Sequence, residues 1–249
     1  MKVKALVALL GLTASLGSFA GPLVGNSSAP SVINPAPGSE GSLQSIADAV
    51  FPGSGINVNT DQSAAGQWAS SSPAFASSIP TLVAEFTANE STQSFGIWFG
   101  NDTSSILPIN LLLGGAGVGE AVGMTINNVT HQLNVFGADC SHLNCGTFTD
   151  ARINANAFGF FFQASPSSQI FYSLDQLNAP NARTDRFVAF QDGSTTNWLF
   201  AYEDGTDFDY NDMAVKVESI NAVPEPETYA LMLAGLGAMG FVARRRKSR

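Results

Sequence analysis

The stretch Trp198-Leu199-Phe200-Ala201-Tyr202 decides the fold, because an aromatic side chain occupies every second position. Alternate side chains of a β-strand point to the same face, so these three rings are expected to pack together against a facing sheet. The same alternation recurs over residues 95–99 and 158–162. Shorter apolar runs lie between turn signals rich in Pro, Asn, Asp and Gly. Short strands at this spacing predict an all-β fold, an antiparallel β-sandwich or jelly roll.

An acidic segment, residues 203–212, follows this stretch and reads Glu203-Asp204-Gly205-Thr206-Asp207-Phe208-Asp209-Tyr210-Asn211-Asp212. If the segment is extended, Asp207, Asp209 and Asn211 present three oxygen ligands on one face, while the two aromatic rings pack on the other. Crowded carboxylates repel one another unless a cation or solvent separates them, and hard oxygen ligands suit calcium. A solvated acidic turn that holds no ion is the alternative.

The calcium prediction assigns a role to each polar residue of the acidic segment. Asp207, Asp209 and Asn211 are the expected inner ligands. Glu203, Asp204 or Asp212 would complete or orient the shell. Calcium takes about six to eight oxygen ligands, so another loop has to contribute, and Asp192 is the candidate.

The two cysteines are five positions apart, in Cys140-Ser141-His142-Leu143-Asn144-Cys145. Two thiols and an imidazole in so short a stretch, next to Asp139, also fit a zinc site. An exported protein with two cysteines more often oxidises them. We therefore predict a disulfide between Cys140 and Cys145, with zinc as the lesser alternative.

Both ends of the chain carry targeting features. Residues 1–20 combine a basic start, an apolar run and Ser18-Phe19-Ala20, which predicts a signal helix cleaved between Ala20 and Gly21. Residues 21–40 are rich in Pro, Ser, Gly and Asn and are expected to form a flexible leader. The β domain is then expected over 41–221, starting with a short helix over 42–51.

The C-terminal end, residues 222–249, contains Pro224-Glu225-Pro226, an apolar stretch over 229–243 and a terminal Arg-rich cluster. At about 1.5 Å per residue a helix over that stretch reaches about 22 Å, short of the ~30 Å hydrocarbon core. It spans a membrane if flanking residues contribute and the basic cluster stays in the cytoplasm. We expect a C-terminal transmembrane helix.

This order of features resembles the PEP-CTERM sorting signal of Gram-negative bacteria. The resemblance implies that an exosortase is a partner and cuts near the Pro-Glu-Pro element. It also implies export across the inner membrane, transient anchoring there before processing, and a final place at the cell surface or outside the cell.

Charge and motifs exclude several classes of function. The chain has a formal net charge of −9, and residues 21–223 hold four basic against 18 acidic residues. Such a body repels phosphate backbones, so no nucleic-acid partner is expected. The Gly-rich run over 114–119 lacks the Lys-Ser/Thr of a phosphate-binding loop. With two histidines, no Gly-x-Ser-x-Gly element and no carboxylate pair singled out, we expect no enzyme.

The body resembles an uncharacterised extracellular domain family common in PEP-CTERM proteins. Its most specific marks here are Glu203-Asp204 and the Asp-x-Asp-x-Asn-Asp element over 207–212. The resemblance implies a secreted β-rich domain and supplies no catalytic residues. We expect a cell-surface or matrix protein that acts by binding or assembly, associated with exopolysaccharide in a biofilm. The alternative is a carbohydrate-binding or glycan-cleaving domain that uses Trp68, Trp98 or Trp198 as stacking platforms.

Overall fold

In the computed structural model, the aromatic run over 198–202 forms strand β12 (Trp198–Tyr202), and all five of its residues are buried. It lies between β11 and β13, and every strand pair of this sheet is antiparallel. The register sets Phe187 and Met213 on either side of Tyr202. The acidic segment therefore joins β12 to β13 at one end of the inner strands of this central sheet, which consists of β11 (Phe187–Gln191), β12, β13 (Met213–Val217) and β3 (Thr81–Glu85).

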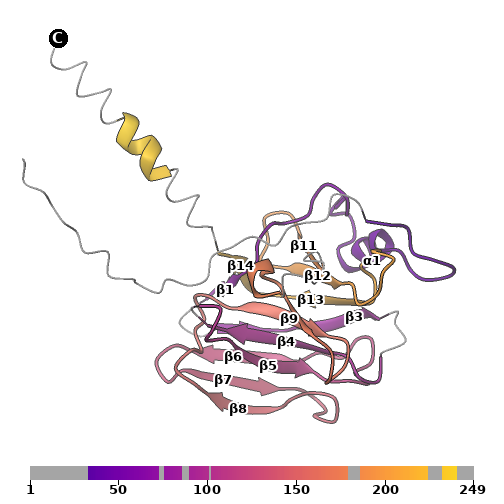
Figure 1. The fold of residues 1–249 in the computed structure, drawn as a ribbon, viewed down its shortest axis with the longest axis horizontal. Helices are drawn as coiled ribbons and strands as arrows, with labels where there is room; N and C mark the ends of the chain where they lie inside the picture. Colours follow the sequence, from indigo (N-terminus) through magenta and orange to yellow (C-terminus); the bar gives the residue numbers. More distant parts are fainter. Residues whose placement is uncertain are drawn as a thin grey trace, which may run out of the picture.

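Two further four-stranded sheets and one strand pair complete the described β structure, all antiparallel (Figure 1). One sheet has the order β10-β9-β4-β5, with β10 (Ile170–Tyr172), β9 (Gly159–Gln163), β4 (Ser94–Phe99) and β5 (Leu107–Leu112). The other has the order β2-β6-β7-β8, with β2 (Ala76–Ser78), β6 (Gly123–Asn127), β7 (Gln132–Phe136) and β8 (Gly146–Thr149). The pair is β1 (Trp68–Ser70) with β14 (Ile220–Ala222), and a short 3-10 helix, η1, covers Asp175–Leu177.

The main core lies where the central sheet faces β4 and β9. Ring centroids of Phe160 in β9 and Phe200 in β12 are 4.8 Å apart, and Trp68 lies at the same distance from Phe200. Aromatic pairs of this kind contribute about 0.5–1.5 kcal/mol beyond their burial. The predicted alternation is confirmed, since the alternating residues of all three runs belong to one buried cluster.

The three tryptophans are buried, with exposures of 0%, 0% and 1% for Trp68, Trp98 and Trp198. Trp68 and Trp198 belong to the main core. Trp98 packs with Phe161 and Leu174 on the other face of its sheet. A buried indole offers no face to a sugar, so the alternative use of these residues as stacking platforms is wrong.

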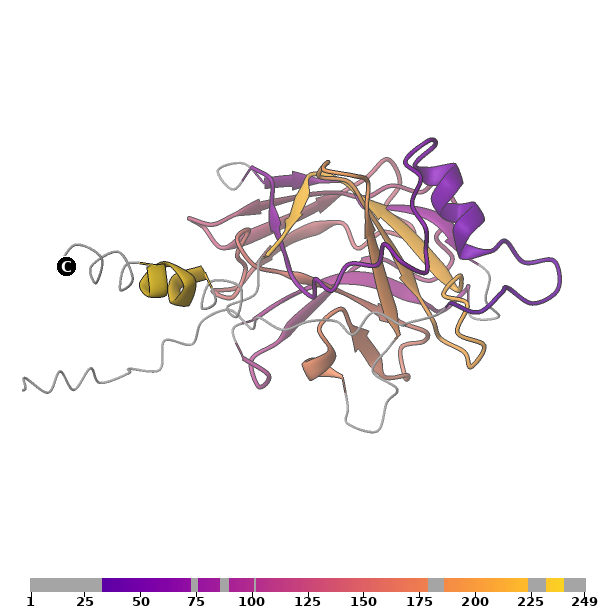
Figure 2. The same ribbon diagram turned by 90° about the horizontal axis from the view of Figure 1, so that it is seen from above.

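The N-terminal segment, residues 33–58, covers the second face of the central sheet (Figures 1 and 2). Its helix α1 (Leu43–Val50) begins after Ser42, whose hydroxyl accepts a hydrogen bond from Ser45 N at 3.2 Å. The helix expected over 42–51 is thus present. Because this segment shields the outer face, the central sheet is buried on both sides, through Val188, Phe190, Leu199, Ala201 and Ala214.

The structure describes residues 33–72, 76–85, 90–100, 102–178, 186–223 and 232–239. The predicted signal helix with its cleavage between Ala20 and Gly21 lies outside these residues, as does Pro224-Glu225-Pro226. Within the expected membrane span, residues 232–239 are helical. In the described ranges, no helix is long and apolar enough to cross a membrane. A mostly β, antiparallel fold is confirmed.

Candidate metal centre

The acidic segment is an irregular loop between β12 and β13, so the condition under which the ligands would share one strand face, an extended segment, is not met. Phe208 and Tyr210 have φ angles of 60° and 56°, in the left-handed region. Two such residues turn the chain, so alternate positions do not share the face of a strand. Burial accounts for this conformation, because Tyr210 is fully buried and Phe208 packs in the same cluster beneath the N-terminal segment.

Three carboxylates nevertheless converge in this loop. One oxygen each from Glu203, Asp207 and Asp209 lies within 4.8 Å of the other two. Glu203 and Asp209 are 0% and 1% exposed, while Asp207 is exposed. Gly205 leaves the space between them open, since a Cβ there would lie 3.0 Å from Glu203 Oε1 and 3.2 Å from Asp207 Oδ1. This buried group of like charges has the composition of a cation site.

Two buried oxygens of the loop have no hydrogen-bond partner: Asp209 Oδ2 and Asn211 Oδ1. The other polar atoms of both side chains are held. Asp209 Oδ1 accepts from Asn211 N at 3.2 Å, and Asn211 Nδ2 donates to Gly41 O at 3.1 Å. A buried acceptor without a partner costs about 1–3 kcal/mol, and more when it is charged. A cation bound by these oxygens would remove that cost.

Burial also changes the acidity of the loop. It raises the pKa of the Glu203 and Asp209 carboxyls. It raises the pKa of Asp212 to about 8, and the charge of Glu203 adds to this shift. Asp212 Oδ2 accepts hydrogen bonds from Asp204 N at 2.6 Å and Gly205 N at 3.4 Å. Asp212 therefore shapes the turn, whereas the convergent group consists of Glu203, Asp207 and Asp209.

Arg186 contacts the acidic segment, although the sequence did not single it out. Its Nη1 lies 3.8 Å from Glu203 Oε1 and donates to Gly205 O. Its guanidinium also lies 5.3 Å from the ring centroid of Phe208. Its position in the sequence could have indicated this contact. Arg186 directly precedes β11 and Glu203 directly follows β12, and the antiparallel pairing of these two strands places the two residues side by side. Arg186 offsets part of the negative charge and braces the loop.

Asp192, in contrast, does not reach the acidic segment. It follows β11 at the end where Gln191 pairs with Trp198, whereas the acidic segment starts beyond Tyr202 at the opposite end. The hairpin register separates the two along the length of the strands. The expectation that Asp192 contributes a ligand is wrong.

The N-terminal segment contacts the acidic segment directly. Asn34 N donates to Phe208 O at 3.0 Å, and Asn34 Nδ2 donates to Asp207 O. Glu40 lies close enough for its charge to contribute to the raised pKa of Asp209, whose main cause is burial. Residues 33–40, part of the predicted leader, therefore contact the site. The predicted domain limits stay a prediction.

Cys140 and Cys145 are joined in a disulfide, which leaves neither sulfur as a thiolate ligand for zinc. The closed loop lies between β7 and β8. It presents the buried Leu143, which forms an isolated bridge with Leu112 of β5. The disulfide thus braces a loop that covers the end of an edge strand.

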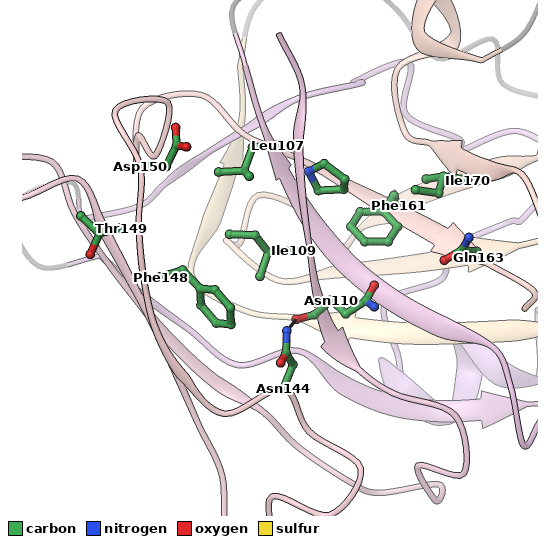
Figure 3. A pocket seen from close by; sticks show the side chains of 11 residues that line it. Leu107, Ile109, Asn110, Asn144, Phe148, Thr149, Asp150, Phe161, Gln163 and Ile170 are labelled. Atoms are coloured by element: carbon green, nitrogen blue, oxygen red, sulfur yellow. Dashed lines mark hydrogen bonds between the residues drawn. The ribbon is translucent and has the colours of Figure 1, made fainter. Parts of the chain in front are cut away.

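A separate cleft of about 440 Å³ lies between the edge strands β5 and β8 (Figure 3). Ring and aliphatic groups form much of its wall, including Phe148, Phe161 and Ile170. The carboxylate that lines it, Asp150, is paired with Arg152 at 2.7 Å, and this bond lowers the pKa of Asp150 to about 2. The uncharged polar groups are Asn110, Asn144, Thr149 and Gln163.

The C-terminal end matches a family model described as the PEP-CTERM protein-sorting motif, over residues 222–247. Comparisons with curated proteins and with solved structures found no match. The family of the body is not identified, so its resemblance to an extracellular domain family stays a prediction. The sorting motif itself is confirmed, and it implies export, cell-surface localisation in a Gram-negative bacterium and processing by an exosortase.

Proposed function

We propose that this protein is an exported surface or matrix component that acts by binding or assembly rather than by catalysis, with a body stabilised by calcium. The sorting motif supports the destination. The observation that carries the calcium proposal is the convergence of Glu203, Asp207 and Asp209, together with a buried oxygen of Asp209 that has no hydrogen-bond partner. Because the site lies in the loop between two central strands, an ion there would tie β12 to β13.

Calcium suits this site better than the other common divalent ions. The candidate ligands are all oxygens, from three carboxylates and the Asn211 amide. Zinc prefers nitrogen and sulfur ligands, and magnesium requires a near-ideal octahedron. Calcium accepts irregular loops, and water molecules would supply the remaining ligands. Extracellular calcium sites commonly have Kd values of about 10⁻⁴ to 10⁻³ M.

Thermal melting of the purified mature protein tests this proposal. With calcium at about 100 times Kd, the folded form should gain about 2.7 kcal/mol. For a domain of this size that gain corresponds to a rise in Tm of about 5–10 °C. Magnesium should have a much smaller effect. The double variant Asp207→Asn/Asp209→Asn should lose the response, while the control Asp192→Asn, at the far end of the hairpin, should keep it. A wild-type Tm unaffected by several millimolar calcium would refute the proposal.

The cleft between β5 and β8 favours a second candidate function, the binding of an uncharged saccharide. Its volume lies within the range of small-molecule sites, about 300–1,000 Å³. Amide groups beside apolar walls match a ligand with hydroxyls and C–H faces. Cleavage by paired carboxylates needs an acid with a raised pKa, and Asp150 has a lowered one.

A glycan-array screen of wild type against Asn110→Ala and Phe148→Ala tests this second candidate. Both variants should weaken binding of the same neutral glycans. Exopolysaccharide from the native host is the natural follow-up probe. Binding that both variants leave unchanged would place the glycan elsewhere, and an absence of binding to any glycan would refute this function.

A further inference from the structure

We infer that the N-terminal segment is part of the calcium site, and that calcium binding fastens this segment to the central sheet. This inference rests on the proposed calcium site. It extends that site from one loop to two parts of the chain. The residues involved, Asn34 and Asp207, are 173 positions apart in the sequence.

The hydrogen bonds between the two parts involve candidate ligands of the ion and the residue next to one of them. The backbone carbonyls of Asp207 and Phe208 accept from Asn34. At the other end of the site, the Asn211 amide donates to Gly41 O while its own oxygen stays without a partner. An ion bound by the Asp207 carboxylate and the Asn211 oxygen would fix the groups that the segment contacts.

Packing links the same two parts. Phe208 and Tyr210 alternate with the candidate ligands and belong to the apolar cluster beneath the segment. Their left-handed backbone sets where these rings point. If the backbone of the loop changes conformation, both rings leave the cluster, and the N-terminal segment loses two of the side chains on which it packs. The segment contributes Ile33, Leu43, Ile46, Phe51, Ile56 and Val58 to this cluster.

Charge gives the direction of the coupling. Without an ion, the Glu203, Asp207 and Asp209 carboxylates repel one another. Glu40 brings a further negative charge from the segment itself, in the turn that precedes Gly41. This repulsion, which Arg186 offsets in part, opposes docking of the segment on the loop. A divalent cation reverses its sign, because each carboxylate is then attracted to a shared charge.

Coupling of this kind is reciprocal, since whatever strengthens docking of the segment also strengthens calcium binding by the same factor. Substitutions on the segment alone should therefore change calcium affinity. Asn34→Ala removes the side-chain contact to Asp207 O and leaves every carboxylate in place. Glu40→Gln removes an exposed charge without disturbing the core.

Hydrogen exchange of the mature protein, in several millimolar calcium and in chelator, measures docking. We expect the amides of α1 to exchange at least tenfold faster in chelator, while those of β4 and β9 do not change. Calorimetry should show calcium affinity several-fold weaker in Asn34→Ala and changed in Glu40→Gln. The matched control Asn156→Ala, at an exposed asparagine away from the site, should bind like the wild type.

The outcomes separate the two proposals. Calorimetry could show that calcium binds while the hydrogen exchange of α1 is unchanged, or while both segment variants keep the wild-type affinity. Either result would refute the coupling between calcium and the N-terminal segment, but not the calcium site. An absence of calcium binding in the wild type would overturn the site itself, and the fastening with it. Faster α1 exchange in chelator together with altered binding in the segment variants would support both.

Discussion

Asp212 illustrates how burial acts on single residues of the acidic segment. It is 8% exposed and lies beside Glu203, so its carboxyl has a pKa far above the usual range. The pKa values of Glu203 and Asp209 are shifted in the same direction, mainly by burial. Raised pKa values mean that the folded state binds more protons than the unfolded chain between about pH 4 and pH 8.

The stability of the calcium-free protein should therefore fall as pH rises from 5 to 8. Below the ordinary carboxyl pKa the stabilising contribution of these groups is fully present, and it is lost as pH passes through the raised values. Calcium favours the ionised forms, so its stabilising effect should grow over the same range. Urea denaturation at pH 5, 6.5 and 8, in chelator and in calcium, measures both trends. A calcium-free stability that rises with pH would contradict this account.

A substitution of Gly205 tests whether an ion occupies the space between the Glu203 and Asp207 carboxylates. Gly205→Ala places a methyl group 3.0 Å from Glu203 Oε1 and 3.2 Å from Asp207 Oδ1, where the ion would lie. We expect calcium affinity to fall about tenfold, or ~1.4 kcal/mol. The calcium-free stability should change by less than about 1 kcal/mol, because alanine also restricts the unfolded chain. Calorimetry and urea denaturation give the two quantities. Unchanged affinity would show that the ion does not occupy this space.

Among the elements, the edge strands depend on loops that cover them. Leu113 N donates to His142 O at 2.8 Å, and Asn144 N donates to Leu111 O at 3.1 Å. The disulfide closes the loop that carries these residues. Since β5 is an edge strand, these bonds satisfy backbone groups that otherwise offer a template for pairing with another chain.

Replacing both cysteines by alanine should lower the free energy of unfolding by about 2 kcal/mol, the chain-entropy value for so short a loop. The fold should persist, because this loop adds only Leu143 to the buried residues of the main core, and the rest come from other parts of the chain. Urea denaturation of the variant measures the loss, and reduced wild type should match it. A double variant as stable as the oxidised wild type would show that the bridge adds no stability.

For the whole molecule, the described core ends just before the sorting element. Ala222 pairs with Trp68, and Val223 N donates to Gln67 O at 3.0 Å. Every member of the two larger buried clusters precedes Pro224. Cleavage near the Pro-Glu-Pro element would therefore leave these clusters intact.

A variant that ends at Val223 should melt within about 1 °C of the longest form that can be purified, since no residue of the described core is removed. In the native host, mass spectrometry should show a mature N-terminus at Gly21 and loss of the chain after the Pro-Glu-Pro element. Mature protein that retains Arg244-Arg245-Arg246 would contradict exosortase processing. A truncated body that unfolds would show that the C-terminal end supports the fold.

Strands, the short helix and the sorting motif could all be predicted from the sequence. Trp198, Phe200 and Tyr202 alternate along the chain, so their side chains share one face of a strand, and this face has to be buried. The prediction needs no knowledge of the facing sheet, because the alternation of side chains is a local property of the backbone. The spacing of apolar residues located α1 in the same way. The sorting motif is also local and consecutive in the chain, so its residue order alone identifies it.

The arrangement of the acidic segment could not be predicted in this way, because it depends on tertiary contacts. Alternation would place the ligands on one face only in an extended segment, and burial of Phe208 and Tyr210 overrides that local pattern. Arg186 and Asn34 reach the site from positions distant in sequence. Contacts across such separations depend on how sheets and segments pack, and a single sequence carries no periodic signal for them.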